Sequence, residues 1–110
     1  MAYLPEAGDL VWINFDPQAG REQAKNRPAL VITGAEFNAA TGLLMACPVT
    51  GTERPWRTRI ALLGTATSGF VMIEQVKSID WRARGAAFIE HAPRPLFEDV
   101  KSRIATMLDL

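Results

Sequence analysis

The sequence has only one cysteine and one histidine among its 110 residues. The single cysteine, Cys47, cannot form an intramolecular disulfide, which fits a protein of the reducing cytoplasm. The single histidine, His91, without any Cys/His cluster, excludes a zinc site, a histidine-based triad and a ribonuclease mechanism that uses two histidines. Cys47 itself lies in the apolar run LLMACPV, which favours a buried structural thiol over a nucleophile.

Long hydrophobic runs and an excess of charge of one sign are also missing. No apolar run reaches the roughly 18 residues that span a bilayer, and the N-terminus lacks the basic and apolar regions of a secretion signal. No glycine-rich phosphate loop is present. Twelve basic and twelve acidic residues cancel, so the overall charge does not indicate a polyanionic partner. The length predicts one globular domain over residues 1–110.

The charges that are present are unevenly distributed along the chain. Residues 21–84 contain nine lysines and arginines against five acidic residues, and the two ends carry the compensating negative charge. This asymmetry would suit a cationic groove, although an even scatter of solvated charges fits the sequence at least equally well.

Alternating hydrophobicity predicts several short strands. From Asp9 to Phe15 the side chains alternate between two faces, the period expected of a half-buried strand. Residues 16–26 contain a proline, a glycine and a polar run, and they predict a surface loop. Short apolar segments separated by turn regions, the first of them at 38–42, predict further strands at 29–33, 43–49, 58–62, 70–73, 76–79 and 86–90. The segment at 76–79 would continue the strand before it. This pattern favours a mainly β fold, a small antiparallel barrel or sandwich.

The C-terminal segment changes its period. From Leu96 to Leu108 the apolar residues recur at spacings of four, four, three and one, which places them along one helical stripe. Acidic residues precede basic ones along this segment, as the helix dipole favours. We therefore expect a C-terminal α-helix, beginning after Pro95, that packs its stripe on the sheet.

A carboxylate and a guanidinium lie five residues apart at the end of the predicted loop. Glu22 and Arg27 form a candidate acid–base pair for a reaction that passes through a negatively charged phosphorus centre. An exposed glutamate and arginine on a polar loop are more often simply solvated, with an ion pair worth about 0 to 1 kcal/mol. The residues alone leave both interpretations open.

Four segments occur in an order that resembles a known family: GDLVWINFDP, EQAKNRPALVI, CPVT and IEQVKSIDWRAR. They resemble the motifs of the MazF/PemK (Kid) family of mRNA interferase toxins and cover nearly the entire chain, and the WRAR run is most similar to the MazF branch. The resemblance implies a homodimeric, SH3-like antiparallel β-barrel with a C-terminal helix. It also implies a cytoplasmic toxin of a type II toxin–antitoxin system, which cleaves single-stranded RNA at short sequences without a metal or other cofactor. A MazE-like antitoxin would hold it inactive.

The resemblance also assigns roles to residues. Metal-free RNA cleavage needs a base for the 2′-OH proton, a donor that stabilises the phosphorane and an acid for the departing 5′-oxygen. Arg27 is expected to stabilise the transition state with the help of Thr50, and either Glu22 or Arg27 is the general base. The products would carry 2′,3′-cyclic phosphate and 5′-hydroxyl ends. RNA binding by stacking and hydrogen bonding is expected from Asn14, Gln23, Lys25, Arg54, Trp56, Arg57, Gln75, Lys77 and Ser78.

Several alternatives stay open at this point. Trp56 either stacks on a base or folds back onto the barrel. The chain departs from the family pattern at Lys25, near which a glycine is more common, and in the segment GTERPWR, so a relative's cleavage sequence is not transferred to it. A non-enzymatic toxin of the same fold that poisons a DNA gyrase, as CcdB does, is the second candidate function, although the C-terminal MLDL lacks an aromatic anchor. The third is an inactive RNA-binding module.

Overall fold

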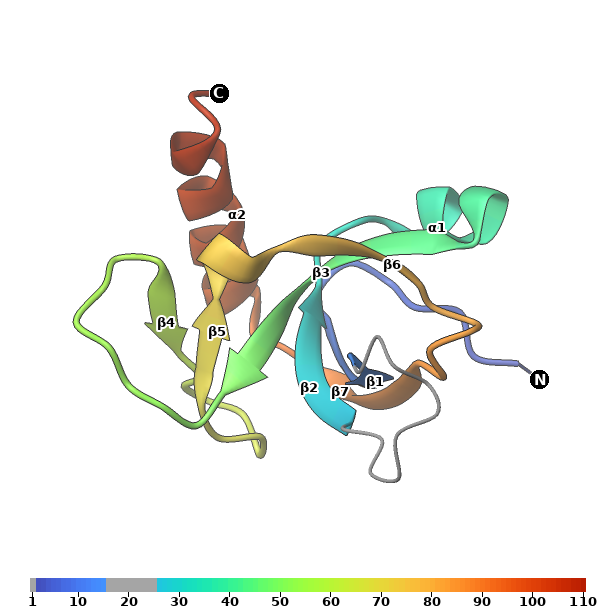
Figure 1. Cartoon of the computed structure of the whole chain (residues 1–110), viewed down its shortest axis with the longest axis horizontal. Coiled ribbons are helices and arrows are strands. Elements are labelled where there is room, and N and C mark those ends of the chain that lie inside the picture. Colours follow the sequence, from blue (N-terminus) through green and yellow to red (C-terminus); the bar gives the residue numbers. More distant parts are fainter. Residues whose placement is uncertain (1, 16–25) are drawn as a thin grey trace.

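The computed structural model describes residues 2–15 and 26–110. Within these ranges the chain forms short strands, two α-helices and one turn of 3-10 helix (Figure 1). In chain order the elements are β1 (Asp9–Asn14), β2 (Asn26–Val31), α1 (Ala35–Thr41), β3 (Leu43–Thr50), β4 (Arg59–Ala61), β5 (Phe70–Met72), η1 (Ile73–Gln75), β6 (Lys77–Asp80), β7 (Ala87–His91) and α2 (Arg94–Met107).

The strands pair antiparallel in the order β4-β5-β3-β2-β1-β7, and β6 also pairs with β3. One edge of β3 pairs with β2, and the other edge pairs first with β6 and then with β5. β5 and β6 therefore run along one edge of β3 as an interrupted strand with η1 between them. The predictions of a mainly β fold and of a segment at 76–79 that continues the strand before it are confirmed.

Apolar clusters cover both faces of this sheet. The first cluster contains Leu10 and Leu30 together with Val100 of α2. The second, which we call the β6-side cluster, contains Val11 and Ile13 and is closed by residues of β6 and the turn after it. Successive residues of β1 thus enter opposite clusters, as its period of two predicted. Leu10 is buried on one face and Val11 and Ile13 on the other, while Trp12 is exposed. β1 is thus more buried than the half-buried strand expected from the sequence, and burial is worth about 1.5 to 3 kcal/mol for each large side chain.

Helix α2 begins at Arg94, two residues before the expected start after Pro95. Pro95 occupies its first turn, where a missing N–H costs no helical hydrogen bond. Leu96 and Val100 are buried on the predicted stripe, whereas Met107 is 41% exposed. The last turns of α2 extend past the sheet (Figure 1). In the described part of the chain, neither helix has the length and apolarity to cross a membrane.

Helix α1 was not expected, because its residues read as a turn region at 38–42. The segment is held in helical form by tertiary hydrogen bonds to the fully buried Asn38. The Asn38 side-chain amide donates to the carbonyl oxygens of Pro5 and Thr33, at 2.9 and 3.0 Å. The Trp81 indole N–H donates to the Asn38 carbonyl at 3.0 Å. Pro5 and Trp81 are distant from Asn38 in sequence, and local turn propensity therefore gave the wrong answer.

Candidate active site

The site is organised around the point at which β2 and β3 separate. Ala29 of β2 pairs with Pro48 of β3 at the end of their ladder. Two residues further in the same antiparallel register, Arg27 would face Thr50. The ladder stops before that pair, and on its other edge β3 continues to pair with β5 as far as Thr50 and Phe70. Strands β2 and β3 diverge there (Figure 1), so Arg27 and Thr50 lie on the two arms of a fork between the strands. We call this point the β2–β3 fork.

Arg27 and Thr50 belong to the same face of the sheet. Arg27 is two residues from Ala29, and Thr50 is four residues from Ala46, both of which lie in the β6-side cluster. Because side chains alternate along a strand, Arg27 and Thr50 continue this face beyond its apolar part. Arg27 is exposed and, within residues 2–15 and 26–110, makes no ion pair, while Thr50 is partly buried. The exposure of Arg27 lets its guanidinium meet an external anion.

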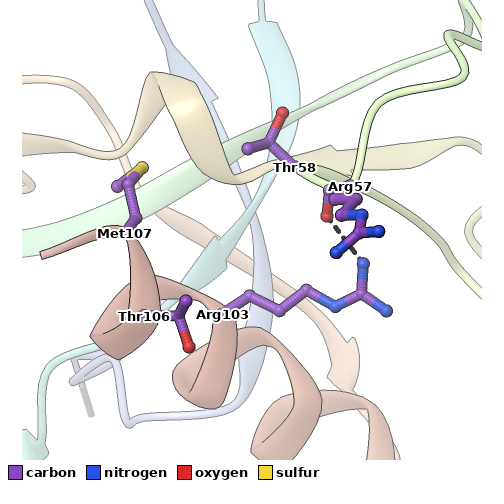
Figure 2. Close-up of a pocket in the computed structure, with 5 residues that line it drawn as sticks. All are labelled: Arg57, Thr58, Arg103, Thr106 and Met107. Atoms are coloured by element: carbon purple, nitrogen blue, oxygen red, sulfur yellow. Dashed lines mark hydrogen bonds between the residues drawn. The ribbon is translucent and has the colours of Figure 1, made fainter. Parts of the chain in front are cut away.

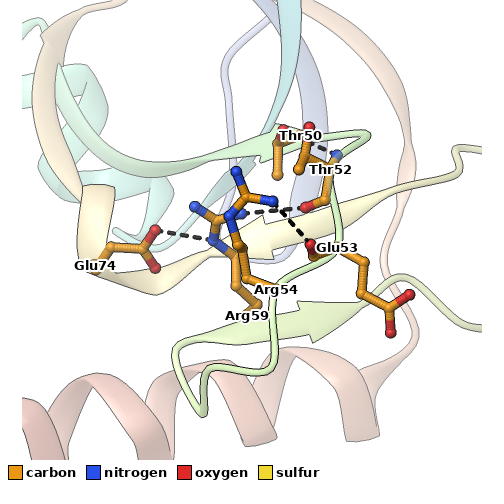
Figure 3. Close-up of polar contacts among 6 residues, drawn as sticks. All are labelled: Thr50, Thr52, Glu53, Arg54, Arg59 and Glu74. Atoms are coloured by element: carbon orange, nitrogen blue, oxygen red, sulfur yellow. Dashed lines mark hydrogen bonds and ion pairs between the residues drawn. The ribbon is translucent and has the colours of Figure 1, made fainter.

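The hydroxyl of Thr50 is oriented by its own turn. Its oxygen accepts a hydrogen bond from the backbone N–H of Thr52 at 3.2 Å (Figure 3). A hydroxyl has one proton and two acceptor positions, so this bond leaves the Thr50 proton free to be donated. Thr50 can therefore act as a neutral donor to a phosphate oxygen.

Thr52 connects this turn to a largely buried ion pair (Figure 3). Its carbonyl oxygen accepts a hydrogen bond from Arg59 Nη1 at 3.2 Å, and Arg59 Nε donates to Glu74 Oε2 at 2.9 Å. The side chains of Arg59 and Glu74 are only 9% and 24% exposed. Burial raises the pKa of Glu74, but the Thr58 hydroxyl, the backbone N–H of Glu74 and the Arg59 guanidinium outweigh it and hold that pKa below its usual value. Glu74 is therefore ionised at neutral pH.

Trp56 lies over this ion pair. The guanidinium carbon of Arg59 is 4.7 Å from the centre of the Trp56 ring, close enough for a cation–π interaction. The Arg59 backbone N–H also donates to the Trp56 carbonyl at 3.1 Å. The Trp56 side chain is nevertheless 49% exposed. One side of the indole thus rests on the arginine that begins β4, and the ring does not fold into the core.

Strand β6 adds a second cation to the face of the fork. Lys77 pairs in register with Ala46, and its Nζ lies 5.4 Å from the centre of the Phe15 ring. By strand alternation Lys77 shares the face of Arg27 and Thr50. Ser78, the next residue, takes the opposite face, and Gln75 is exposed at the end of η1. The structure therefore brings Lys77 to the predicted site but not Ser78.

Two of the predicted arginines lie elsewhere on the 51–57 loop. Arg54 Nη1 donates to the neighbouring Glu53 carbonyl at 3.2 Å (Figure 3). The Arg57 carbonyl accepts a hydrogen bond from Arg103 Nη1 of α2 at 2.6 Å (Figure 2). A groove of about 570 Å³ opens there, lined by Arg57, Thr58, Arg103, Thr106 and Met107 (Figure 2). Arg57 thus borders a groove against α2 that contains neither Arg27 nor Thr50.

Three predicted site residues, Glu22, Gln23 and Lys25, lie outside the described residues, so their roles stay predictions. Asn14 pairs in register with Asn26 at the end of β1, next to the strand that carries Arg27. Across residues 2–15 and 26–110, no group of three or more His, Cys, Asp or Glu residues is arranged to hold a metal ion.

The sequence analysis missed the pairing of Arg59 with Glu74. A signal was present, because each charge adjoins an apolar segment, in TRIAL and in FVMIEQ. Charged residues embedded in apolar strands are seldom buried unless they are paired. Two such residues of opposite sign would have predicted this contact.

The fold and the site together define a class: a small, mainly antiparallel β protein with a C-terminal helix and a polar, cationic face suited to a phosphate group. The chain belongs to the family described as the PemK-like, MazF-like toxins of type II toxin–antitoxin systems, which its sequence matches over residues 6–108. The family resemblance inferred from the sequence motifs is confirmed.

Similar proteins support the MazF branch. The chain is 43% identical over 84 residues to the endoribonuclease toxin MazF of Escherichia coli (strain K12), an alignment that covers 76% of each protein. It is 36% identical over 108 residues to the Escherichia coli endoribonuclease PemK, covering 94% of this chain and 81% of the relative. The MazE–MazF crystal structure (Form-II) from Deinococcus radiodurans matches with a TM-score of 0.91 and 40% identity, over 99% of each chain. These relatives do not favour the gyrase-poisoning alternative.

Proposed function

We propose that the chain is a toxin that cuts single-stranded RNA, with Arg27 and Thr50 acting on the scissile phosphate at the β2–β3 fork. The strand register carries this proposal, because it sets the exposed Arg27 guanidinium and the oriented Thr50 hydroxyl on one face at the point where the strands part. A planar guanidinium and a neutral hydroxyl are suited to the non-bridging oxygens of a phosphorane. Such donors act where negative charge develops.

The proposed reaction is an internal transesterification. The 2′-oxygen of one nucleotide bonds to its own 3′-phosphorus while the bond to the next 5′-oxygen breaks. The 2′-proton passes to a base, for which Glu22 is proposed, and an acid, for which Arg27 is proposed, protonates the leaving oxygen. The products are a 2′,3′-cyclic phosphate and a 5′-hydroxyl end.

The remaining proposed RNA contacts divide into two kinds. Lys77 shares the face of the fork and is proposed to hold a neighbouring phosphate, a contact that positions the strand without reading its sequence. Trp56 presents an aromatic surface for an unpaired base. The other proposed RNA-binding residues are Asn14, Gln23, Lys25, Arg54, Arg57, Gln75 and Ser78.

The proposed partners are a second copy of the chain and a MazE-like antitoxin. Support comes from the family and from the solved MazE–MazF structures of similar proteins. We propose that an acidic, disordered antitoxin tail competes with RNA for the cationic face. The proposed substrate, mRNA, places the activity in the cytoplasm.

The test is cleavage of a long unstructured RNA by the purified protein in excess EDTA, with the new ends mapped. We expect cuts that carry cyclic phosphate and 5′-hydroxyl ends. Arg27→Ala should lower the single-turnover rate by a factor on the order of 10² to 10³, the usual effect of removing a transition-state donor. Thr50→Ala should lower it by a factor of about 10². Arg94→Ala, an exposed arginine at the start of α2, is the matched control.

Each contrary outcome contradicts a different part of the proposal. RNA that is bound but not cut would identify an inactive RNA-binding module. Full activity in Arg27→Ala would remove the assignment of the site. A reaction that stops on chelation would contradict the metal-independent mechanism, and gyrase inhibition without RNA cleavage would restore the CcdB-like alternative.

A further inference from the structure

A continuous set of contacts links the partly buried carboxylate of Glu74 to the proposed catalytic hydroxyl of Thr50 (Figure 3). Glu74 holds Arg59, Arg59 holds the Thr52 carbonyl, and the N–H of the same Thr52 residue holds the Thr50 hydroxyl. The same guanidinium also supports the Trp56 ring at 4.7 Å. One arginine therefore contacts both ends of the exposed 51–57 loop.

We propose that Arg59 is a positioning residue that fixes the Thr50 hydroxyl and the Trp56 ring relative to each other. RNA would then be held at two linked points, a phosphate at Thr50 and one unpaired base on the open face of Trp56. This inference rests on the proposed RNA cleavage and adds a residue that the resemblance to the family did not assign.

Burial shows that Arg59 acts through other residues. Its side chain is only 9% exposed, so it has little surface to offer a polyanion. Two of its three nitrogens already donate within the protein, Nε to Glu74 and Nη1 to Thr52. Arg27 differs from it in being exposed. Arg59 thus organises the site, and Arg27 is the arginine that meets the substrate.

The loop needs such an anchor. Every residue from Gly51 to Arg57 is exposed, so packing does little to restrict this segment. A loop that becomes ordered only on binding loses affinity to its conformational entropy, and a misplacement of about 1 Å at a reacting group can cost about 10²-fold in rate. An arginine that holds two separate points of the loop limits both losses.

Lysine cannot replace Arg59 in this role. The ammonium group of a lysine is a single point on a flexible stem, whereas the planar guanidinium donates in two fixed directions and stacks on an aromatic face. Arg59→Lys keeps the charge beside Glu74 but cannot also reach Thr52 and cover the indole. This substitution therefore separates geometry from charge.

The experiment measures kcat and KM for cleavage of a short single-stranded RNA. Arg59→Lys should lower kcat by about tenfold to 10²-fold through Thr50, and should raise KM by about fivefold or more through Trp56, since base stacking on an aromatic ring contributes that much or more. Lys101→Gln, which removes a cation over the Phe97 ring on α2, is the control and should change neither constant.

Double variants show whether Arg59 acts through the two residues named. In a Thr50→Ala background, Arg59→Lys should no longer lower kcat, and in a Trp56→Ala background it should no longer raise KM. A merely structural arginine would reduce the active fraction by the same factor in every background. That result would overturn the inference.

A second variant covers the case in which Arg59→Lys does not fold. Glu74→Gln keeps Arg59 and its bond to Thr52 but removes the charge that holds the guanidinium. It should change kcat and KM by smaller factors than Arg59→Lys, and these changes should likewise disappear in the Thr50→Ala and Trp56→Ala backgrounds. If the unmodified protein does not cut RNA, the proposed function fails. If it cuts RNA, but the effects of Arg59→Lys and Glu74→Gln on kcat and KM are the same in every background, only the positioning role fails.

Discussion

The ion pair between Arg59 and Glu74 leads to a quantitative prediction about stability. Glu74→Gln removes the charge opposite a guanidinium whose side chain is 9% exposed. Removing one partner of a fully buried pair costs about 3 to 5 kcal/mol. Because the Glu74 side chain is 24% exposed, water partly solvates the site, and glutamine can still accept one hydrogen bond. We therefore expect a loss of about 2 kcal/mol in the free energy of unfolding at pH 7.

A second ion pair in the same chain is the matched control. Arg103 Nε lies 3.1 Å from Asp99 Oδ1 with the two side chains 42% and 45% exposed. Asp99→Asn removes the same type of contact from the surface of α2 and should cost only about 0.3 to 0.5 kcal/mol. The difference between the two variants isolates the effect of burial.

The assay is urea unfolding at a fixed protein concentration, repeated between pH 7 and pH 3. The pKa of Glu74 is lowered in the folded protein, so its contribution to stability is complete above the pKa of the unfolded chain and is lost as the pH falls through the folded value. The stability difference between the unmodified protein and Glu74→Gln should thus shrink in acid. Equal losses for Glu74→Gln and Asp99→Asn, or a difference that does not depend on pH, would refute the reasoning.

Three further predictions concern Gly69 beside β3, Leu30 in the core and the thiol of Cys47. Gly69→Ala should destabilise the fold by more than about 1 kcal/mol, because φ is +128° and a Cβ would lie 2.7 Å from the Thr50 carbonyl oxygen of β3. Gly51→Ala, which has open space around its Cβ position, should be close to neutral in the same unfolding assay. Leu30→Ala, at a fully buried position, should cost about 2 to 5 kcal/mol, whereas Leu63→Ala, at an exposed position, should change stability by less than about 0.5 kcal/mol. Burial and a nearby carboxylate raise the pKa of Cys47 to about 12, so iodoacetamide at pH 8 should label it only after unfolding, and rapid labelling of the native protein would contradict this.

Local patterns predicted much of the fold. The alternation of β1 correctly assigned Val11 and Leu10 to opposite faces, and the stripe from Leu96 correctly predicted α2. Both patterns depend on side-chain period alone. Helix α1 was missed because hydrogen bonds to Asn38 from distant residues, among them Trp81, override a local turn signal.

The candidate site was less accessible to sequence reasoning. Motif similarity selected Arg27 and Thr50, but their common face depends on the register between β2 and β3, which no periodicity reveals. The link from Thr50 to Glu74 passes through Arg59, which is fifteen residues from Glu74, and needs both the loop and the turn at η1 in place. Contacts of that kind follow from tertiary packing.

The central claim is that Arg27 and Thr50 act on the same phosphate. A double-mutant cycle of single-turnover RNA cleavage tests it most directly, with Arg27→Ala, Thr50→Ala and the double variant compared under conditions in which all are folded. We predict that the double variant is much less impaired than the product of the two single effects, because the donors serve one transition state. Purely multiplicative effects, or an unchanged rate in either single variant, would contradict the account.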